Sequence, residues 1–215
     1  MKVLLSILVV LLAFEASAQD KYTFVFLHHR SDLAPLPKEE SDKLMQGHMA
    51  NIQKMHKDGH LSAAGPFEGG GGMFLFKEGS FEDIEKWMNA DPGIKAKRWN
   101  IEMLPYEPLI GGVCNASEPF EMVMYTFVHF QPKIYKFNVQ EAGEVVAKHD
   151  KFIKQLSAGG NVITYASFGG DDGGVLVMKG DIQQEVILQD PAVVEALFTP
   201  EFKKLYVAKG SFCEK

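Results

Sequence analysis

The stretch Tyr22-Thr23-Phe24-Val25 recurs letter for letter as Tyr125-Thr126-Phe127-Val128 later in the chain. The first copy lies in a run with apolar residues at both odd and even positions, which predicts a strand buried on both faces. The two copies begin about 100 residues apart, a spacing too long for a solenoid repeat and suited to a small domain. The chain is therefore expected to contain two copies of one fold.

A histidine followed by an Asp-Pro pair also occurs twice. His48 precedes Asp91-Pro92, and His149 precedes Asp190-Pro191 at nearly the same spacing. An imidazole can transfer protons near neutral pH, and a carboxylate that accepts its Nδ1–H leaves Nε2 to act on a substrate. His48, Asp91, His149 and Asp190 are therefore the candidate catalytic residues. The alternative is a buried histidine satisfied by one carboxylate, with the aspartate ending a helix before proline.

The order of the expected elements predicts an α+β fold. Each copy reads as strand, helix, hairpin, helix and strand, the βαββαβ order of a ferredoxin-like unit. The first copy has its strands and helices at about 21–29, 38–57, 60–76, 80–89 and 99–106, and the second at about 122–130, 139–157, 161–178, 182–188 and 204–212. One such unit leaves a sheet face bare, and the other copy is the obvious cover. We expect two tandem ferredoxin-like domains that form an intramolecular dimeric α+β barrel.

The first 18 residues have the pattern of a secretory signal peptide. Lys2 is the basic start, Leu4 to Phe14 is the apolar run, and Ala16-Ser17-Ala18 ends it with small residues. The apolar run is shorter than the roughly 20 residues of a membrane span. The expected division is a signal peptide at 1–18, a first domain at 20–107, a linker at 108–118 and a second domain at 119–215. The protein is expected to be secreted or periplasmic, with no membrane association after cleavage.

The two cysteines, Cys114 and Cys213, lie on either side of the second copy. Export permits a disulfide, which would tie the ends of that domain together. Such a long loop contributes up to about 4–5 kcal/mol in the chain-entropy model. The alternative is two unpaired thiols.

Charge and composition argue against several classes of function. A net charge of -6 with no basic cluster lacks the footprint of a nucleic-acid-binding protein. His56 and His60 have a spacing that metal ligands use, but Gly59 lies between them and no third ligand is near, so no metal site is expected. The glycines at 69–72 lack the Lys-Ser/Thr of a phosphate-binding loop, and no cofactor is expected.

The segment from His48 to Pro66, followed by Asn89-Ala90-Asp91-Pro92 and an aromatic final strand, resembles the YCII-related (YciI-like) family. The resemblance covers residues 21–106 and, through the repeat, extends more loosely over 122–212. It implies a dimeric α+β barrel, occurring singly or in tandem, with a His–Asp pair proposed as the active site. Relatives with that barrel include muconolactone-isomerase-like enzymes. The second copy departs from the pattern, because Ala166-Ser167 stand where the first has Gly65-Pro66.

These features predict an exported, cofactor-free enzyme of lyase or isomerase type that acts on a small organic acid or ring compound. His48 would be the general acid/base and Asp91 would orient it. Arg30 and His28, at the end of the first strand, are candidates for substrate binding. The alternative function is a barrel that binds a small ligand without turning it over. Because both copies lie in one chain, we expect that no second chain is needed to complete the fold, so that a monomer is possible and further association stays open.

Overall fold

In the computed structural model, the described residues, 21–133, 138–181 and 184–214, form eight strands and six helices. The signal peptide predicted at 1–18 and the start of the helix predicted at 182 lie outside them. The first half of the fold comprises β1 (Tyr22–His29), α1 (Lys38–Lys57), β2 (Leu61–Pro66), β3 (Gly72–Lys77), α2 (Phe81–Met88), α3 (Pro92–Lys95) and β4 (Trp99–Ile110). The second half comprises β5 (Met122–Pro132), α4 (Val139–Ser157), β6 (Val162–Ser167), β7 (Gly174–Met178), α5 (Gln184–Ile187), α6 (Pro191–Val194) and β8 (Phe198–Ala208).

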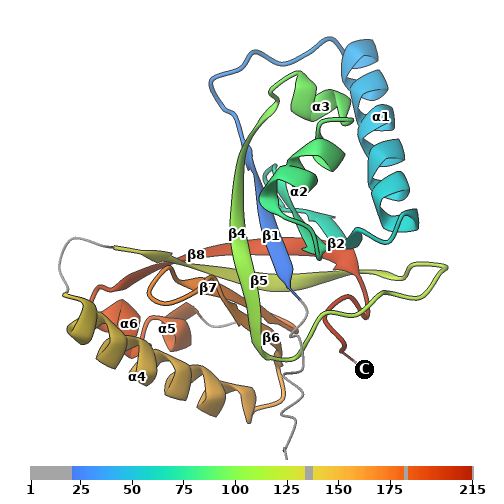
Figure 1. Cartoon of the computed structure of the whole chain (residues 1–215). Coiled ribbons are helices and arrows are strands. Elements are labelled where there is room, and N and C mark those ends of the chain that lie inside the picture. The colour runs from blue at the N-terminus through green and yellow to red at the C-terminus, as the bar shows by residue number, and fades with distance from the viewer. Residues whose placement is uncertain (1–20, 134–137, 182–183, 215) are drawn as a thin grey trace, which may run out of the picture.

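All eight strands belong to one antiparallel sheet in the order β2-β3-β1-β4-β6-β7-β5-β8. The sheet curls until its outer strands meet, because Phe67, directly after β2, bridges Leu205 of β8. There the backbone N–H of Glu68 also donates to the carbonyl oxygen of Lys204 at 2.9 Å. Helices α1 to α3 cover one part of the sheet and α4 to α6 cover another, as Figure 1 shows. The predicted α+β class is confirmed.

The two apolar faces of β1 enter two different cores. Phe24 and Phe26 point into a core enclosed by the curled sheet, where they meet Phe127 of β5. Val25 and Leu27 point outward into the layer beneath α1 and α2. A third core lies between the second half of the sheet and α4. The enclosed core is filled by side chains, so the apolar pattern of β1 reflects burial on both faces.

Two strands differ from their predicted bounds. β4 continues to Ile110, so the residues expected to begin a linker at 108 are part of the sheet, where Pro108 pairs with Ala166. β8 begins at Phe198 and ends at Ala208, whereas the sequence suggested 204–212. Pairing with β5 along the whole of β8 sets these ends, and Phe212 is buried in the enclosed core without being in a strand.

Cys114 and Cys213 form a disulfide with a Cα–Cα distance of 5.0 Å. It joins the segment after β4 to the turn after β8, and the N–H of Cys114 donates to the carbonyl oxygen of Ser211 at 3.0 Å in the same place. The two ends of the second half are therefore held together by a covalent bond and a backbone hydrogen bond.

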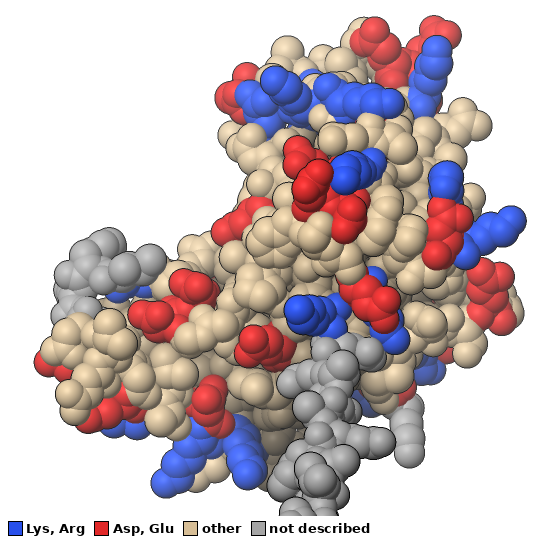
Figure 2. All heavy atoms as spheres, viewed as in Figure 1, with Lys and Arg blue, Asp and Glu red and all other residues tan. Residues whose placement is uncertain are grey.

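Charged side chains of both signs are interspersed on the face seen in Figure 2, with broad uncharged areas between them. Among the described residues, no helix is both long enough and apolar enough to cross a membrane.

His129 of β5 is a buried histidine in the enclosed core. His129 pairs with Glu201 of β8, and Phe26 of β1 pairs with Glu102 of β4. His129 therefore occupies in the second half the position that Phe26 occupies in the first. Its ring stacks on Phe26 at a centroid distance of 4.5 Å, and its Nδ1 has no hydrogen-bond partner. Burial lowers the pKa of His129 from 6.5 to about 4.

The neutral form of His129 is therefore favoured in the folded protein. Its contribution to stability is complete above about pH 6.5 and is lost as the pH falls toward 4, because only the unfolded chain takes up the proton readily. The total loss is up to about 3 kcal/mol. We predict that His129→Phe, which copies Phe26, flattens this pH dependence in urea unfolding between pH 7 and 4. The exposed control His29→Phe should keep the wild-type slope, and an unchanged slope in His129→Phe would refute the assignment.

Candidate functional site

His48 and Asp91 form a buried hydrogen bond between α1 and the start of α3. His48 Nδ1 donates to Asp91 Oδ2 at 2.6 Å, and the Asp91 side chain is fully buried. The imidazole is held between two rings of the first half, with centroid distances of 4.9 Å to Trp99 and 5.9 Å to Phe74. The ring is therefore fixed in place, and its bonded Nδ1 leaves Nε2 as the free nitrogen.

The second oxygen of Asp91 has a structural task. Asp91 is the N-cap of α3, and its Oδ1 accepts from the N–H groups of Gly93 and Ile94 at 2.8 and 3.2 Å. Proline at the first helical position suits this start, because its missing N–H would have no partner there. One carboxylate thus starts a short helix and ties it to α1.

The second half contains the same arrangement. His149 Nδ1 donates to Asp190 Oδ2 at 2.5 Å, and Asp190 Oδ1 accepts from the N–H of Ala192 at the start of α6. The His149 side chain is 1% exposed and its Nε2 is buried without a partner, whereas the His48 side chain is 9% exposed. The two pairs are alike in bonding and differ in access.

The strands beside the two pairs carry side chains of different size. Ala64 of β2 pairs with Phe74 of β3, and Tyr165 of β6 pairs with Leu176 at the matching position of β7. Ala64 and Tyr165 therefore occupy equivalent positions in the two halves. By the same register, Ser62-Ala63-Ala64 of β2 correspond to Ile163-Thr164-Tyr165 of β6. Tyr165 packs against the ring of His149 at 5.4 Å and donates its hydroxyl to Asp150 of α4 at 3.2 Å. Ala64 has neither the ring nor the hydroxyl, so the first half keeps open space that the second half fills.

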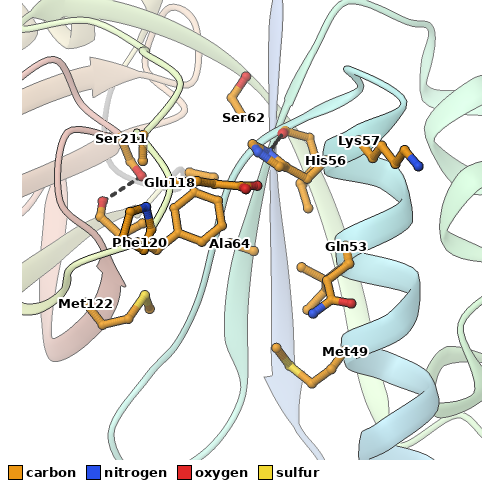
Figure 3. Close-up of a pocket in the computed structure, with 16 residues that line it drawn as sticks. Met49, Gln53, His56, Lys57, Ser62, Ala64, Glu118, Phe120, Met122 and Ser211 are labelled. Atoms are coloured by element: carbon orange, nitrogen blue, oxygen red, sulfur yellow. Dashed lines mark hydrogen bonds between the residues drawn. The ribbon is translucent and has the colours of Figure 1, made fainter.

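That space is a groove of about 860 Å³. Helix α1 forms one wall, β2 forms the floor, and the segment before β5 forms the other wall, as Figure 3 shows. The groove is lined by Met49, Ile52, Gln53, His56 and Lys57 of α1, by 61–64 of β2, by Ala116, Glu118, Pro119, Phe120 and Met122, and by Ala208 and Ser211. Its volume lies in the range of small-molecule sites, roughly 300–1,000 Å³.

The groove follows the seam where β2 and β8 separate. At the corresponding seam between β6 and β4, Thr164 donates its hydroxyl to the carbonyl oxygen of Ile110 at 2.9 Å. Ala63, at the position of β2 that corresponds to Thr164, has no hydroxyl. Pro66 corresponds to Ser167 and has no N–H to offer a neighbouring strand. β2 packs closely against β8 at Gly65, where a Cβ atom would lie 2.3 Å from the carbonyl oxygen of Tyr206.

His56 is the imidazole of the groove. Its Nδ1 lies 3.0 Å from the carbonyl oxygen of Leu61 and must carry the proton of that bond, so in the neutral ring Nε2 is an acceptor. Its ring meets that of Phe120 edge to face at 5.5 Å. In Figure 3 the Glu118 side chain extends toward His56 from the opposite wall. The groove thus combines apolar walls with a few polar groups.

The other residues singled out in the sequence lie elsewhere. Arg30 pairs with Asp32 and donates to the carbonyl oxygen of Lys97, and His28 bonds Glu102 at 2.7 Å. Neither lines the groove or bonds a His–Asp pair, so their role in substrate binding stays a prediction. In the described parts of the chain, no cluster of three or more His, Cys, Asp or Glu side chains has the arrangement of a metal site.

Phe120 and Met122 did not stand out in the sequence, because Phe120 lies between the expected linker and strand and Met122 reads as an ordinary strand residue. The signal that could have revealed the groove is a comparison of the two copies. Ser62-Ala63-Ala64 are all smaller than Ile163-Thr164-Tyr165 at matching positions. Small side chains on a strand that should face a helix indicate missing volume.

Removing either histidine should destabilise the protein, because each leaves a buried carboxylate oxygen without its donor. We predict a loss of about 2–4 kcal/mol for His48→Ala and for His149→Ala, measured by urea unfolding. The loss should be larger for His149→Ala, because water reaches the first pair more readily. The exposed control His29→Ala should change little. Equal stability of all three variants would show that the pairs do not anchor the helices.

No protein-family model matches the chain, and no curated protein matches its sequence. Its structure is similar to that of a candidate chlorite dismutase, with a TM-score of 0.50 and 10% identity, over 88% of this chain and 94% of that one. An anthrone oxidase-like protein has a TM-score of 0.48 at 11% identity, with coverages of 89% and 92%. A heme-binding protein from Thermus thermophilus has a TM-score of 0.47 at 12% identity, with coverages of 88% and 90%. Of these three, the candidate chlorite dismutase reaches a TM-score of 0.50, and at 10% identity that likeness shows the fold alone.

Proposed function

We propose that the protein binds a small, largely apolar molecule in the groove between α1 and β2. The observation that carries this proposal is the replacement of Ile163-Thr164-Tyr165 by Ser62-Ala63-Ala64 at matching positions of the sheet. The second half fills the space beside its long helix with its own side chains. The first half leaves about 860 Å³ open in the same place.

The character of the walls supports a ligand rather than solvent. Met49, Phe120 and Met122 keep 47%, 43% and 39% of their surface exposed, and all three line the groove. Large apolar side chains gathered around a cavity mark binding sites, and methionine adapts its shape to what it contacts. The disulfide supports the wall, because Cys114 and Cys213 each lie two residues from a lining residue, Ala116 and Ser211.

The two halves are best explained as a tandem pair of ferredoxin-like units that form a dimeric α+β barrel within one chain. The recurring element order and the matching strand registers support this arrangement. The resemblance to YCII-related proteins agrees with it. A disulfide suits the secretory route that the first 18 residues suggest, because such bonds persist in oxidising compartments. The chain would then act outside the cytoplasm as a self-contained barrel.

A second candidate function is acid–base catalysis by His48 and Asp91, and the unequal access of the two pairs favours it. His48 retains 9% exposure next to the position where the second half places Tyr165. The sealed Nε2 of His149 has no route to a substrate, so His149 and Asp190 would hold the fold only. His48 itself does not line the groove, although its neighbour Met49 does. In this scheme His48 Nε2 would exchange the proton with a ligand that reaches past Met49, while Asp91 holds Nδ1.

Binding is tested with 1-anilinonaphthalene-8-sulfonate, whose fluorescence rises in apolar sites. We predict saturable binding of about one probe per wild-type chain. Ala64→Tyr, which copies Tyr165, should remove it, because the new ring occupies the part of the groove between β2 and α1 where the probe would lie. The control Leu188→Tyr places the same ring on the exposed surface outside the groove and should bind the probe normally. Undiminished binding by Ala64→Tyr would refute the proposed site.

Access to His48 is tested with diethyl pyrocarbonate, which modifies imidazole nitrogens that solvent can reach. We predict that peptide mapping shows modification of His48 well before that of His149, and that Ala64→Tyr slows the reaction at His48. His29, an exposed histidine, is the internal reference for full reactivity. If His48 and His149 are equally protected, the catalytic candidate is wrong while ligand binding in the groove can still hold.

A further inference from the structure

We propose that the ligand of the groove is an elongated, hydroxylated aromatic molecule, with its ring system beside Ala64 and Met49 and its hydroxyl at His56. This inference rests on the proposed binding function and names the chemical class of the ligand. Its starting point is the second half, where the corresponding space holds a phenol that belongs to the chain itself.

Tyr165 is an internal model of what this space accepts. Its ring is 3% exposed and lies between β6 and α4, edge to face with His149. Its hydroxyl donates to Asp150, which occupies on α4 the position of Met49 on α1. In the first half the ring is missing at Ala64 and the acceptor is missing at Met49. A flat apolar group therefore fits there, but a hydroxyl at that end has no carboxylate to meet.

The polar end of the groove lies further along α1. Met49 and His56 are separated by about 10 Å, at 1.5 Å per helical residue. Two linked or fused aromatic rings have about this length. At the far end the Nε2 of His56 is an acceptor, because Nδ1 is engaged with the carbonyl oxygen of Leu61. A hydroxyl or N–H donor on the ligand would complete the hydrogen bonding of this ring.

The walls between these ends suit an aromatic ring system. Phe120 faces α1 across the groove and already makes an edge-to-face contact with His56, at 5.5 Å. Met49 and Met122 add sulfur atoms, which make favourable contacts with aromatic rings. Among the lining residues, Glu118 and Lys57 bear opposite charges, so the groove offers no net charge that would select an ion.

The test compares 4-phenylphenol with biphenyl, which has the same shape and no hydroxyl. Isothermal titration of the wild-type protein should give one site with roughly tenfold tighter binding of 4-phenylphenol, the value of one net hydrogen bond. His56→Phe should remove this preference by weakening only the phenol, because the ring contact with Phe120 is retained. Ala64→Tyr should abolish binding of both compounds, and Leu188→Tyr should match the wild type.

Each outcome separates the ligand class from the site. If the two compounds bind equally and Ala64→Tyr blocks both, the groove binds apolar molecules but the hydroxylated class is wrong. If the preference for the phenol survives His56→Phe, the hydroxyl is not held by His56. If Ala64→Tyr blocks binding of neither compound nor of the anilinonaphthalene probe, the groove is not the binding site. The proposed function is then wrong together with the proposed ligand class. If Ala64→Tyr does not fold, Ala64→Leu places a smaller side chain at the same position, and its binding of both compounds can be compared with that of the wild type.

Discussion

The burial of both faces of β1 and of β5 is the constraint on which the rest of the structure depends. Phe24 and Phe127 project to one side of these strands and Val25 and Val128 to the other, and all four are fully buried. Burying such side chains contributes roughly 1.5–3 kcal/mol each. A four-stranded unit with helices on one face covers only half of this surface. Curling the eight-stranded sheet around an enclosed core, with helices outside, covers all of it.

The helices stay on the sheet partly through two buried carboxylates. Asp91 and Asp190 each accept a hydrogen bond from a histidine of a long helix. Asp91 also accepts from two backbone N–H groups of a short helix, and Asp190 from one. A carboxylate buried this deeply is tolerated only when both of its oxygens are satisfied. The pairs therefore have a structural explanation that does not require catalysis. The two pairs differ in exposure, since the His48 side chain keeps 9% of its surface accessible and that of His149 keeps 1%.

The functional interest of the fold comes from the difference between its halves. In the second half, Tyr165 fills the space beside α4 and donates a hydrogen bond to Asp150. Thr164 donates a hydrogen bond to the carbonyl oxygen of Ile110 in the neighbouring strand. Ala64 and Ala63 do neither, and at this seam the pairing of the sheet continues only as the isolated bridge between Phe67 and Leu205. The proposed ligand site therefore lies at the seam between β2 and β8.

The sequence by itself determined the kinds of element and their order. The two-sided apolar pattern of β1 and the order of strands and helices depend on residues that are neighbours in the chain, so the sequence alone predicts them. The recurrence of a histidine before an Asp-Pro pair likewise pointed to His48 with Asp91. Tertiary structure decided the extent of β4 and β8, because strand ends depend on partners that are distant in sequence. It also decided the groove, since an empty volume exists only where α1, β2 and the segment around Phe120 come together.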